Sequence, residues 1–364
     1  MPHGKWQMTT APFFHPLCSS LTQDWSALRS HLYRAGFELD VSEQPIRFAT
    51  GLSNLNYLIK LNEKFWVLRR PPAGDLPPGA NDMAREYQIL STLYQAYPLA
   101  PRAIHFSDDK SILGAPFLIM EYRPGLVISG QFPNARTTTP TERSILGLQL
   151  VDLLANLHSV DVSSVGLTSL GRPEGMLERM IEGWSRRAEL AFTSTDRKPT
   201  AGIARVHAWL RARRVPARKP CLLHSDFKLD NVILDPETLV PRAVIDWDMG
   251  TRGDPLVDLA TLLSYWTQQG DPEPMLALNQ MPTTELGFPS RNEVLQAYVA
   301  RTGIDLSDFH FYRVLAMFKL TVVFMQLNAR FLRGEVTQGN YATFGVLAEG
   351  LLECTEAICN GELN

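Results

Sequence analysis

The sequence predicts an α+β fold with two lobes, a small β-rich lobe over residues 1–122 and a larger helical lobe over residues 123–364. Two observations carry this prediction. Short apolar runs bounded by turn residues, which are typical of strands, gather in the first lobe. Longer runs with apolar residues at helical spacing fill the second. A chain of 364 residues is long enough to build both lobes around sizeable cores.

The small lobe is expected to form a sheet with one helix against it. The runs with strand character are 46–50, 55–60, 64–69, 102–106 and 116–122. A turn over residues 50–53 separates the first two strands, and the proline pair at 71–72 stops the third. Asn81 or Asp82 can cap a helix over residues 83–90, where apolar residues recur at helical spacing.

The second lobe is expected to be mainly helical and to begin after a hinge near residues 120–122. Its predicted helices are 142–158, 174–191, 203–214, 256–266, 291–301, 309–332 and 338–359, and its predicted strands are 231–234 and 242–246. Residues 311–332 are the most apolar segment, but they contain charged residues such as Lys319. They therefore indicate a packed helix and not a bilayer span.

The bulk composition excludes several classes of protein. The chain is 45% hydrophobic and 20% charged, and its net charge of −3 points to neither nucleic acid nor a membrane surface. The N-terminal residues lack the apolar stretch of a signal peptide. The four cysteines are scattered without metal-ligand spacing, which predicts reduced thiols in a cytoplasmic protein.

Residues 222–260 carry the most informative pattern, LLHSDFKLDNVILDPETLVPRAVIDWDMGTRGDPLVDLA. Phosphoryl transfer needs a base beside the attacking hydroxyl, a metal ligand nearby and a carboxylate that holds magnesium. Asp226 suits the base, Asn231 suits the nearby ligand, and Asp246 follows a short strand as the carboxylate. A short loop and a hairpin can bring the three together, and oxygen ligands of this kind suit Mg²⁺.

The end of the same pattern predicts a helix start. Asp254 is a good N-cap, and Pro255 suits the first helical position. That cap would hold Asp258 near the loop that carries Asp226. We therefore expect structural roles for Asp254 and Asp258. Asp248 is open to two interpretations, because it can bind metal or order its loop.

This pattern resembles the catalytic and metal-binding loops of the aminoglycoside phosphotransferases, choline kinases and their relatives, which share a protein-kinase-like fold. Their pattern is His-Gly-Asp, four residues, Asn, then Ile-Asp-Trp and Gly-Asp-Pro. Ser225 stands here where the family usually has glycine, which leaves the loop backbone less free. The resemblance implies a kinase that uses ATP and Mg²⁺, with Asp226 as base and Asn231 and Asp246 as metal ligands. It also gives His224 a structural role, bonded to the backbone near Asp246.

The resemblance implies further roles in the small lobe. Backbone N–H groups around Gly51, and the Ser53 hydroxyl, would contact the ATP phosphates. Arg69 would replace the lysine that protein kinases place on the third strand, paired with Glu86 on the following helix and bound to phosphate. Strand alternation turns Arg70 to the other face. Residues 117–122, with Glu121, resemble the hinge whose backbone bonds adenine.

Within the family the chain most resembles the kinase domains fused to, or encoded with, acyl-CoA dehydrogenase-like proteins. The matching runs are TGLSNL (50–55), VLRRPP (67–72), MAREY (83–87), LGAPF (113–117) and DWD (246–248). That branch implies phosphorylation of the hydroxyl of a 4-hydroxyacyl-CoA thioester, and a companion acyl-CoA dehydrogenase-like enzyme.

Charge offers a separate argument about the substrate. Residues 186–219 contain ten Arg or Lys against two acids, which disfavours a polycationic aminoglycoside and would attract the phosphates of CoA. The same residues can instead be a solvated helix face. Three hypotheses therefore stand: a hydroxyacyl-CoA kinase, a kinase of another small alcohol such as an aminoglycoside, amino alcohol or sugar, and an ATP-binding pseudokinase scaffold.

Overall fold

The structure is a computed structural model, and it describes residues 23–42, 44–48, 54–72, 81–133, 136–193, 195, 200–335 and 340–363. The chain divides into two compact units. The first comprises Met1–Pro124 and Ile245–Gly250, and the second comprises Gly125–Val244 and Thr251–Asn364. The sequence placed a lobe boundary at 122 but did not predict that residues 245–250 join the first unit.

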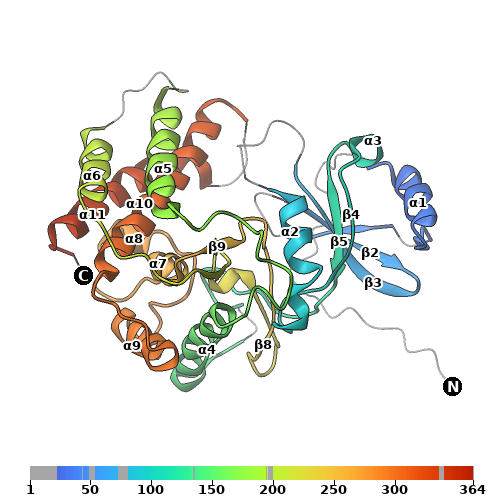
Figure 1. The fold of residues 1–364 in the computed structure, drawn as a ribbon, viewed down its shortest axis with the longest axis horizontal. Coiled ribbons are helices and arrows are strands. Elements are labelled where there is room, and N and C mark those ends of the chain that lie inside the picture. The colour runs from blue at the N-terminus through green and yellow to red at the C-terminus, as the bar shows by residue number, and fades with distance from the viewer. Residues whose placement is uncertain are drawn as a thin grey trace. The chain divides into compact units, whose positions relative to one another are not determined.

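The first unit is built on a five-stranded antiparallel sheet in the order β1-β2-β3-β5-β4 (Figure 1). The strands are β1 (Ile46–Arg47), β2 (Leu55–Leu61), β3 (Lys64–Arg70), β4 (Ala103–Ser107) and β5 (Phe117–Glu121). All five predicted strands are present. The predicted helix is α2 (Met83–Leu90), and its cap is Asp82, whose side chain accepts from the N–H of Arg85.

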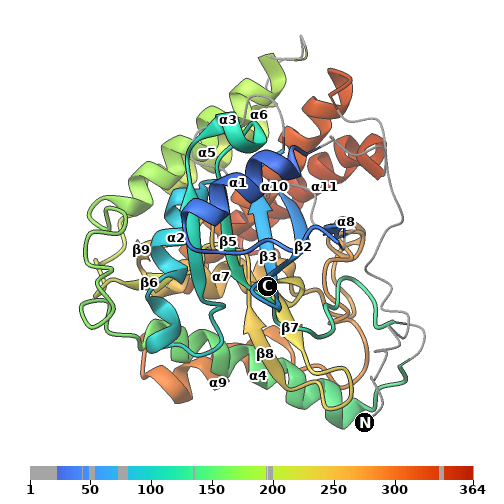
Figure 2. The ribbon, with the colours of Figure 1, turned by 90° about the vertical axis from the view of Figure 1, so that its right-hand side faces the viewer.

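Two helices of this unit were not predicted. These are α1 (Trp25–Arg34) and the short α3 (Lys110–Leu113), which Asp109 caps. Figure 2 shows α1 lying across one face of the sheet. Leu28 and Leu32 of α1 pack there against alternate residues of β2, including Tyr57 and Ile59, and these apolar side chains form the core of the unit.

The second unit is mainly helical and carries two short two-stranded antiparallel sheets. Its helices are α4 (Pro140–His158), α5 (Met176–Thr193), α6 (Ala201–Arg211), α7 (Pro255–Tyr265), α8 (Glu273–Leu276), α9 (Arg291–Thr302), α10 (Phe309–Leu332) and α11 (Phe344–Asn360). The strands β7 (Val232–Leu234) and β8 (Pro241–Val244) pair as predicted. The pair β6 (Cys221–Leu223) and β9 (Thr251–Gly253), and α8, were not predicted. The helix expected at 338–359 begins at 344, after a 3₁₀ turn over Asn340–Thr343.

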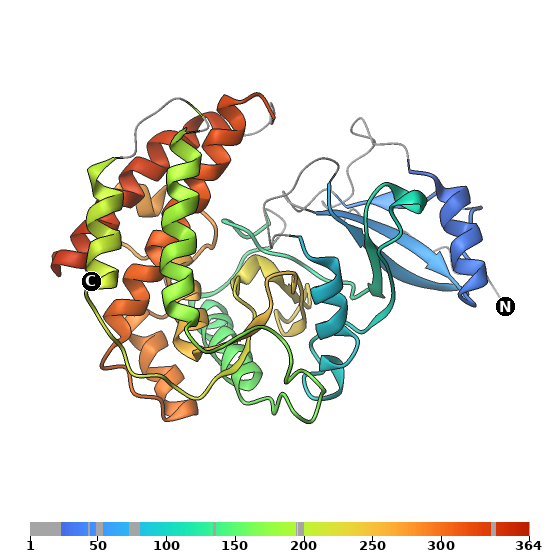
Figure 3. The ribbon, with the colours of Figure 1, turned by 45° about the horizontal axis from the view of Figure 1, so that its top comes forward.

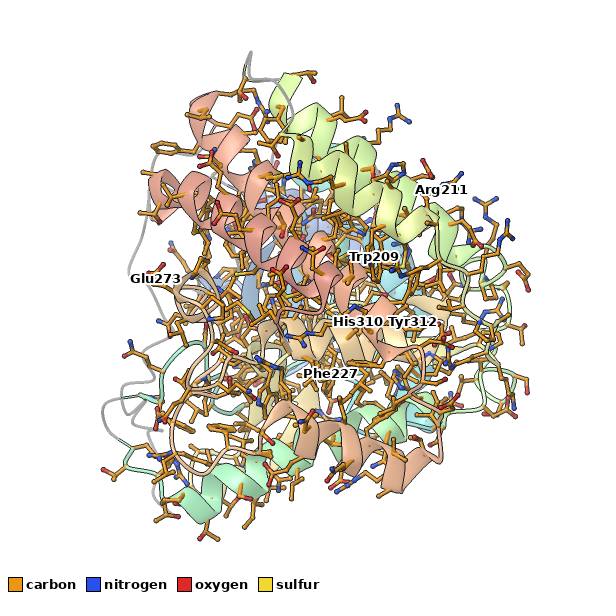
Figure 4. All side chains as sticks on the ribbon, turned by 90° about the vertical axis from the view of Figure 1, so that its left-hand side faces the viewer. Trp209, Arg211, Phe227, Glu273, His310 and Tyr312 are labelled. Atoms are coloured by element: carbon orange, nitrogen blue, oxygen red, sulfur yellow. The ribbon has the colours of Figure 1, made fainter. Side chains whose placement is uncertain are left out.

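Helix α10 is the centre of the second unit. It packs against α5, α7 and α11, and Figure 3 shows α5, α10 and α11 side by side. By length and composition α10 could cross a membrane, but 67% of its apolar window is buried inside the protein. Trp209 of α6 and His310 of α10, labelled in Figure 4, have ring centroids 5.4 Å apart. The helix therefore packs as the core helix that the sequence predicted.

Candidate active site

Asp226 lies in the second unit, on a loop between β6 and the 3₁₀ turn η2 (Leu229–Asn231). We call residues 224–231 the Asp226 loop. Asp258, buried in the first turn of α7, accepts hydrogen bonds of 2.7 Å from the N–H groups of both His224 and Ser225. Asp254 caps α7 through the N–H of Leu256, at 3.0 Å. The structural contacts expected for these two aspartates are therefore present.

The carboxylate of Asp226 is partly exposed and is surrounded by donors and cations. Lys228 Nζ lies 3.3 Å from its Oδ2. Asn231 Nδ2 donates to the Asp226 backbone oxygen at 2.8 Å and approaches Oδ2 at 3.3 Å. Burial acts to raise the pKa of Asp226, but Lys228, Lys319 and His224 outweigh it and lower that pKa below its ordinary value. The side chain is therefore ionised at neutral pH and able to accept a proton.

The backbone of the Asp226 loop is held in an unusual conformation. Ser225 has φ of +68°, in the left-handed region that favours glycine. Its Oγ is buried and has no hydrogen-bond partner among the described residues. The N–H of Asp226 donates to His224 Nδ1 at 3.3 Å, and Lys319 Nζ donates to the Ser225 carbonyl oxygen at 2.5 Å. The structural role predicted for His224 thus has a contact inside the loop, and its predicted bond near Asp246 stays a prediction.

The first unit contains a compact charged cluster around Arg69 on β3. Its Nε donates to Glu86 Oε2 at 2.8 Å, and its Nη2 binds Asp246 Oδ1. Asp248 Oδ2 is 3.8 Å from the same nitrogen. Arg69 and Glu86 are buried, with 5% and 0% of their surface exposed. The structure therefore brings together three of the residues that the sequence selected: Arg69, Glu86 and Asp246.

Charge in this cluster is unbalanced, because three carboxylates surround one guanidinium. Burial raises the pKa of Glu86 to about 8, with Arg69 opposing and Asp248 and Asp246 adding to the rise. The carboxylates in turn raise the pKa of Arg69, against the effect of its burial. A divalent cation would balance the remaining negative charge. No three acidic, histidine or cysteine side chains among the described residues form a complete metal site.

Asp248 makes contacts that order its own segment. Its Oδ2 accepts from Asn54 Nδ2 at 3.1 Å, and Asn81 Nδ2 donates to Asn54 Oδ1 at 2.7 Å. Arg85 Nη1 donates to the backbone oxygen of Asp248 at 3.2 Å. These bonds connect residues 245–250 to α2 and β2. They support the loop-ordering interpretation of Asp248, while a metal-binding role stays a prediction.

For the remaining predicted residues the structure gives only part of the expected contacts, or none. Gly51 and Ser53 lie outside the described residues. Glu121 ends β5, where its N–H donates to the Arg102 carbonyl oxygen at 2.8 Å and its side chain accepts from Arg123 at 2.8 Å. Arg70 points to the other face of the sheet, as alternation predicts, and donates to Gln23 Oε1 at 2.6 Å. The adenine contact predicted at Glu121 stays a prediction.

Sequence reasoning missed three residues of these sites. Lys228 and Lys319 lie close enough to Asp226 to lower its pKa, and Asn54 holds Asp248. A signal for Lys319 was available, because a lysine in the middle of an apolar helix must find a polar partner inside the protein. Asn54 offered no comparable signal, since asparagine beside a turn is common.

The structure describes eight of the ten basic residues of 186–219, and five of these eight contact other groups of the protein. Arg205 and Arg211 form ion pairs with Glu356 and Glu182, at 2.5 and 3.2 Å. Arg187 and Arg213 lie over the rings of Trp184 and Trp209, and Arg218 bonds Tyr312. Exposed Arg186 and Arg214 form no ion pair with another described residue. The charge available to an anionic ligand is therefore smaller than the count in the sequence indicates.

Comparison with known proteins adds three findings. A model of the phosphotransferase enzyme family matches residues 46–292. The mouse acyl-CoA dehydrogenase family member 10 is 30% identical over 310 residues, which are 85% of this chain and 28% of that protein. A Ralstonia eutropha structure assigned as an aminoglycoside phosphotransferase has a TM-score of 0.72 at 22% identity, and the match covers 93% of this chain and 99% of that one.

Other matches agree with these. A thermostable aminoglycoside phosphotransferase variant in a complex with ADP and hygromycin B has a TM-score of 0.55 at 15% identity, covering 93% of this chain and 99% of that one. The structural likenesses confirm the predicted kinase-like fold. The chain spans between 28% and 41% of the length of the curated acyl-CoA dehydrogenase relatives.

Proposed function

Because this chain belongs to the phosphotransferase enzyme family, and so is a kinase-type enzyme for small molecules, we propose that it transfers the γ-phosphate of ATP to the hydroxyl of a 4-hydroxyacyl-CoA thioester. The observation that carries the chemistry is the Asp226 loop. An ionised carboxylate, partly exposed, lies beside the ammonium of Lys228 and the amide of Asn231. In-line phosphoryl transfer requires a carboxylate of this kind as its base.

The proposed reaction is a direct transfer. The acceptor hydroxyl attacks the γ-phosphorus, its proton moves to or is oriented by Asp226, and the bond from the γ-phosphorus to the ADP oxygen breaks. Asn231 and Asp246 would hold Mg²⁺, which neutralises charge on the phosphate oxygens. Arg69 keeps Asp246 and Glu86 in place and contributes positive charge in the first unit.

Two findings support ATP and Mg²⁺. A structurally similar aminoglycoside phosphotransferase was captured with ADP, so the fold accommodates an adenine nucleotide in that protein. The carboxylate cluster around Arg69 carries more negative charge than one guanidinium balances, and Asp246 belongs to it. Proteins relieve such an excess with a bound proton or a cation, and MgATP supplies the cation.

Two arguments favour an acyl-CoA acceptor. Relatives matched over most of this chain are named acyl-CoA dehydrogenases, and in a long multi-part protein two enzyme parts often act on one substrate class. A 4-phosphate would also give the product a good leaving group for a later elimination. The exposed Arg186 and Arg214 offer positive charge to CoA phosphates, but five other basic residues of 186–219 contact groups of the protein itself, which reduces this support.

Product analysis with a panel of acceptors tests the proposal. The protein is incubated with MgATP and 4-hydroxyacyl-CoA thioesters, the free hydroxy acids, an aminoglycoside or choline, and the product masses are read beside ADP release. A phosphate gain on the thioester alone supports the proposal. Phosphorylation of another alcohol keeps the kinase but removes the acyl-CoA assignment. ATP binding without turnover on any acceptor supports a pseudokinase scaffold instead.

A further inference from the structure

Lys319 is a buried cation that neither the motif nor the proposed reaction uses. It lies in the middle of α10, and only 7% of its surface is exposed. Its neighbours along the helix, Phe318 and Leu320, are buried and apolar. Among the described residues, the ammonium makes one hydrogen bond, which goes to the backbone oxygen of Ser225 at 2.5 Å.

Burying an ammonium with a single hydrogen bond is costly. The effective penalty for a buried ion is several kcal/mol, and an apolar residue of similar volume often stabilises such a site. A small cavity is lined by Lys319 together with Met180, Val257, Thr261 and Leu315, and the buried Thr261 Oγ also has no hydrogen-bond partner among the described residues. Packing alone would therefore favour methionine or leucine at this position of α10.

The single hydrogen bond of Lys319 is made to a peptide group whose position affects Asp226. The Ser225 carbonyl and the Asp226 N–H belong to the same peptide plane. Lys319 binds this plane at its oxygen, and His224 Nδ1 accepts from its N–H at 3.3 Å. Asp258 binds the two preceding N–H groups. Ser225 has φ of +68°, a conformation that costs a non-glycine residue free energy, so these contacts hold the loop in a backbone conformation that serine does not favour.

We propose that Lys319 is a positioning residue for phosphoryl transfer, which holds the peptide plane between Ser225 and Asp226 and thereby aims the Asp226 carboxylate. It acts through the loop and does not contact substrate or nucleotide. The unusual cost of burying Lys319 is then explained by catalysis and not by stability.

Three variants separate positioning from packing. Lys319→Met removes the ammonium and keeps the volume, and Lys319→Gln keeps a donor that can reach a carbonyl oxygen. Met325→Ala is the control, since Met325 is buried on the same helix and lines a different cavity, with Phe192 and Leu352. Each protein is assayed for kcat and for KM with MgATP, for thermal unfolding, and for backbone hydrogen exchange over residues 222–232.

The expected result is a loss of about 30- to 100-fold in kcat for Lys319→Met, in line with the cost of a small misplacement of a reacting group. KM for MgATP stays within about twofold, and the melting temperature is unchanged or higher, because a buried charge has been removed. Amide exchange over the Asp226 loop becomes about tenfold faster. Lys319→Gln recovers part of the kcat and part of the protection from amide exchange. Met325→Ala changes neither quantity when each is normalised to the amount of folded protein.

Other results would overturn the inference. A wild-type kcat and wild-type exchange in Lys319→Met would show that the bond does not position the loop. An equal loss of kcat in Met325→Ala would show that Lys319 affects kcat only through packing. The inference rests on the proposed function, and the readouts separate the two: if the wild type neither binds nor uses MgATP, the proposed function fails, while loop exchange still tests the contact.

Discussion

Arg69 Nε donates to Glu86 Oε2 across 2.8 Å, and both side chains are buried within the first unit. The same guanidinium binds Asp246, so one cation holds a carboxylate from α2 and a carboxylate from the segment 245–250. An arginine can do this because its planar group offers several donors in a fixed geometry, whereas a lysine presents one point charge. The arginine at this position therefore shapes the cluster as well as neutralising it.

Removing the guanidinium should strongly destabilise the first unit. Arg69→Met leaves Glu86, Asp246 and Asp248 without their shared cation, and we expect a loss of about 3–5 kcal/mol in the free energy of unfolding. Urea unfolding measures it. If the cluster is a magnesium site, Mg²⁺ should restore part of the loss. Arg70→Met is the matched control, because Arg70 is buried on the opposite face of the same strand. Equal rescue of both variants by Mg²⁺ would contradict a metal site at the cluster.

Asp226→Asn should remove turnover while leaving the nucleotide site intact. An amide cannot accept the acceptor proton, and general-base catalysis contributes about 10²- to 10⁴-fold, so kcat should fall by about that factor. Calorimetric binding of MgATP should stay near the wild-type value. Asp235→Asn, on the turn after β7, is the control and should keep activity. Full activity in Asp226→Asn would show that another group is the base.

Asp246→Asn should abolish turnover and also weaken the binding of MgATP. The change removes one negative charge and one of the proposed magnesium ligands, so the enzyme should need more Mg²⁺ to bind ATP. Binding titrations at several Mg²⁺ concentrations measure this directly. A variant that loses activity without any change in its Mg²⁺ dependence would place Asp246 in a role other than metal binding.

Much of the fold followed from local signals that tertiary contacts did not override. The alternation of β2 and β3 separated Arg69 from Arg70 correctly, and the Asp254-Pro255 pair marked the start of α7. These signals depend on a few neighbouring residues. The pairing of Arg69 with Glu86 could not be predicted from local signals. Only the family resemblance connected this strand residue to one on the next helix.

Other features depend on contacts between distant residues and left little trace in the sequence. Strands β6 and β9 are three residues each and are defined by their pairing. Helix α1 lacks a long apolar run, and its position depends on Leu28 and Leu32 meeting the sheet. The bond from Lys319 to the Ser225 oxygen joins residues 94 apart in the chain. Sequence reasoning used Lys319 only to argue against a membrane span.

Replacing Ser225 by glycine should be tolerated and should slightly stabilise the protein. The left-handed backbone at φ +68° costs a non-glycine residue roughly 1–2 kcal/mol, and the buried Ser225 Oγ has no described partner to lose. Glycine also raises the conformational entropy of the unfolded chain, which offsets part of this gain. A net increase of about 0.5 kcal/mol in the free energy of unfolding is therefore expected. Chemical unfolding measures it. A loss of stability in Ser225→Gly would show that the hydroxyl makes a bond in solution.

Acidification should weaken the first unit through His105 on β4. Its Nε2 lies 2.9 Å from Nε2 of His31 on α1, and burial followed by the charge of His31 lowers the pKa of His105. The unfolded chain therefore takes up a proton at a higher pH than the folded chain does. Stability should be constant above about pH 6.5 and should fall as the pH drops below that value.

Replacing His105 by leucine should flatten that pH dependence. The variant cannot take up the proton, so its melting temperature should change less between pH 7 and pH 5 than that of the wild type. Thermal unfolding across this range makes the comparison. His207→Gln, on α6 in the other unit, is the control and should keep the wild-type slope. If His105→Leu keeps the full slope, the acid sensitivity arises from other groups, and the contact between α1 and β4 is insensitive to pH.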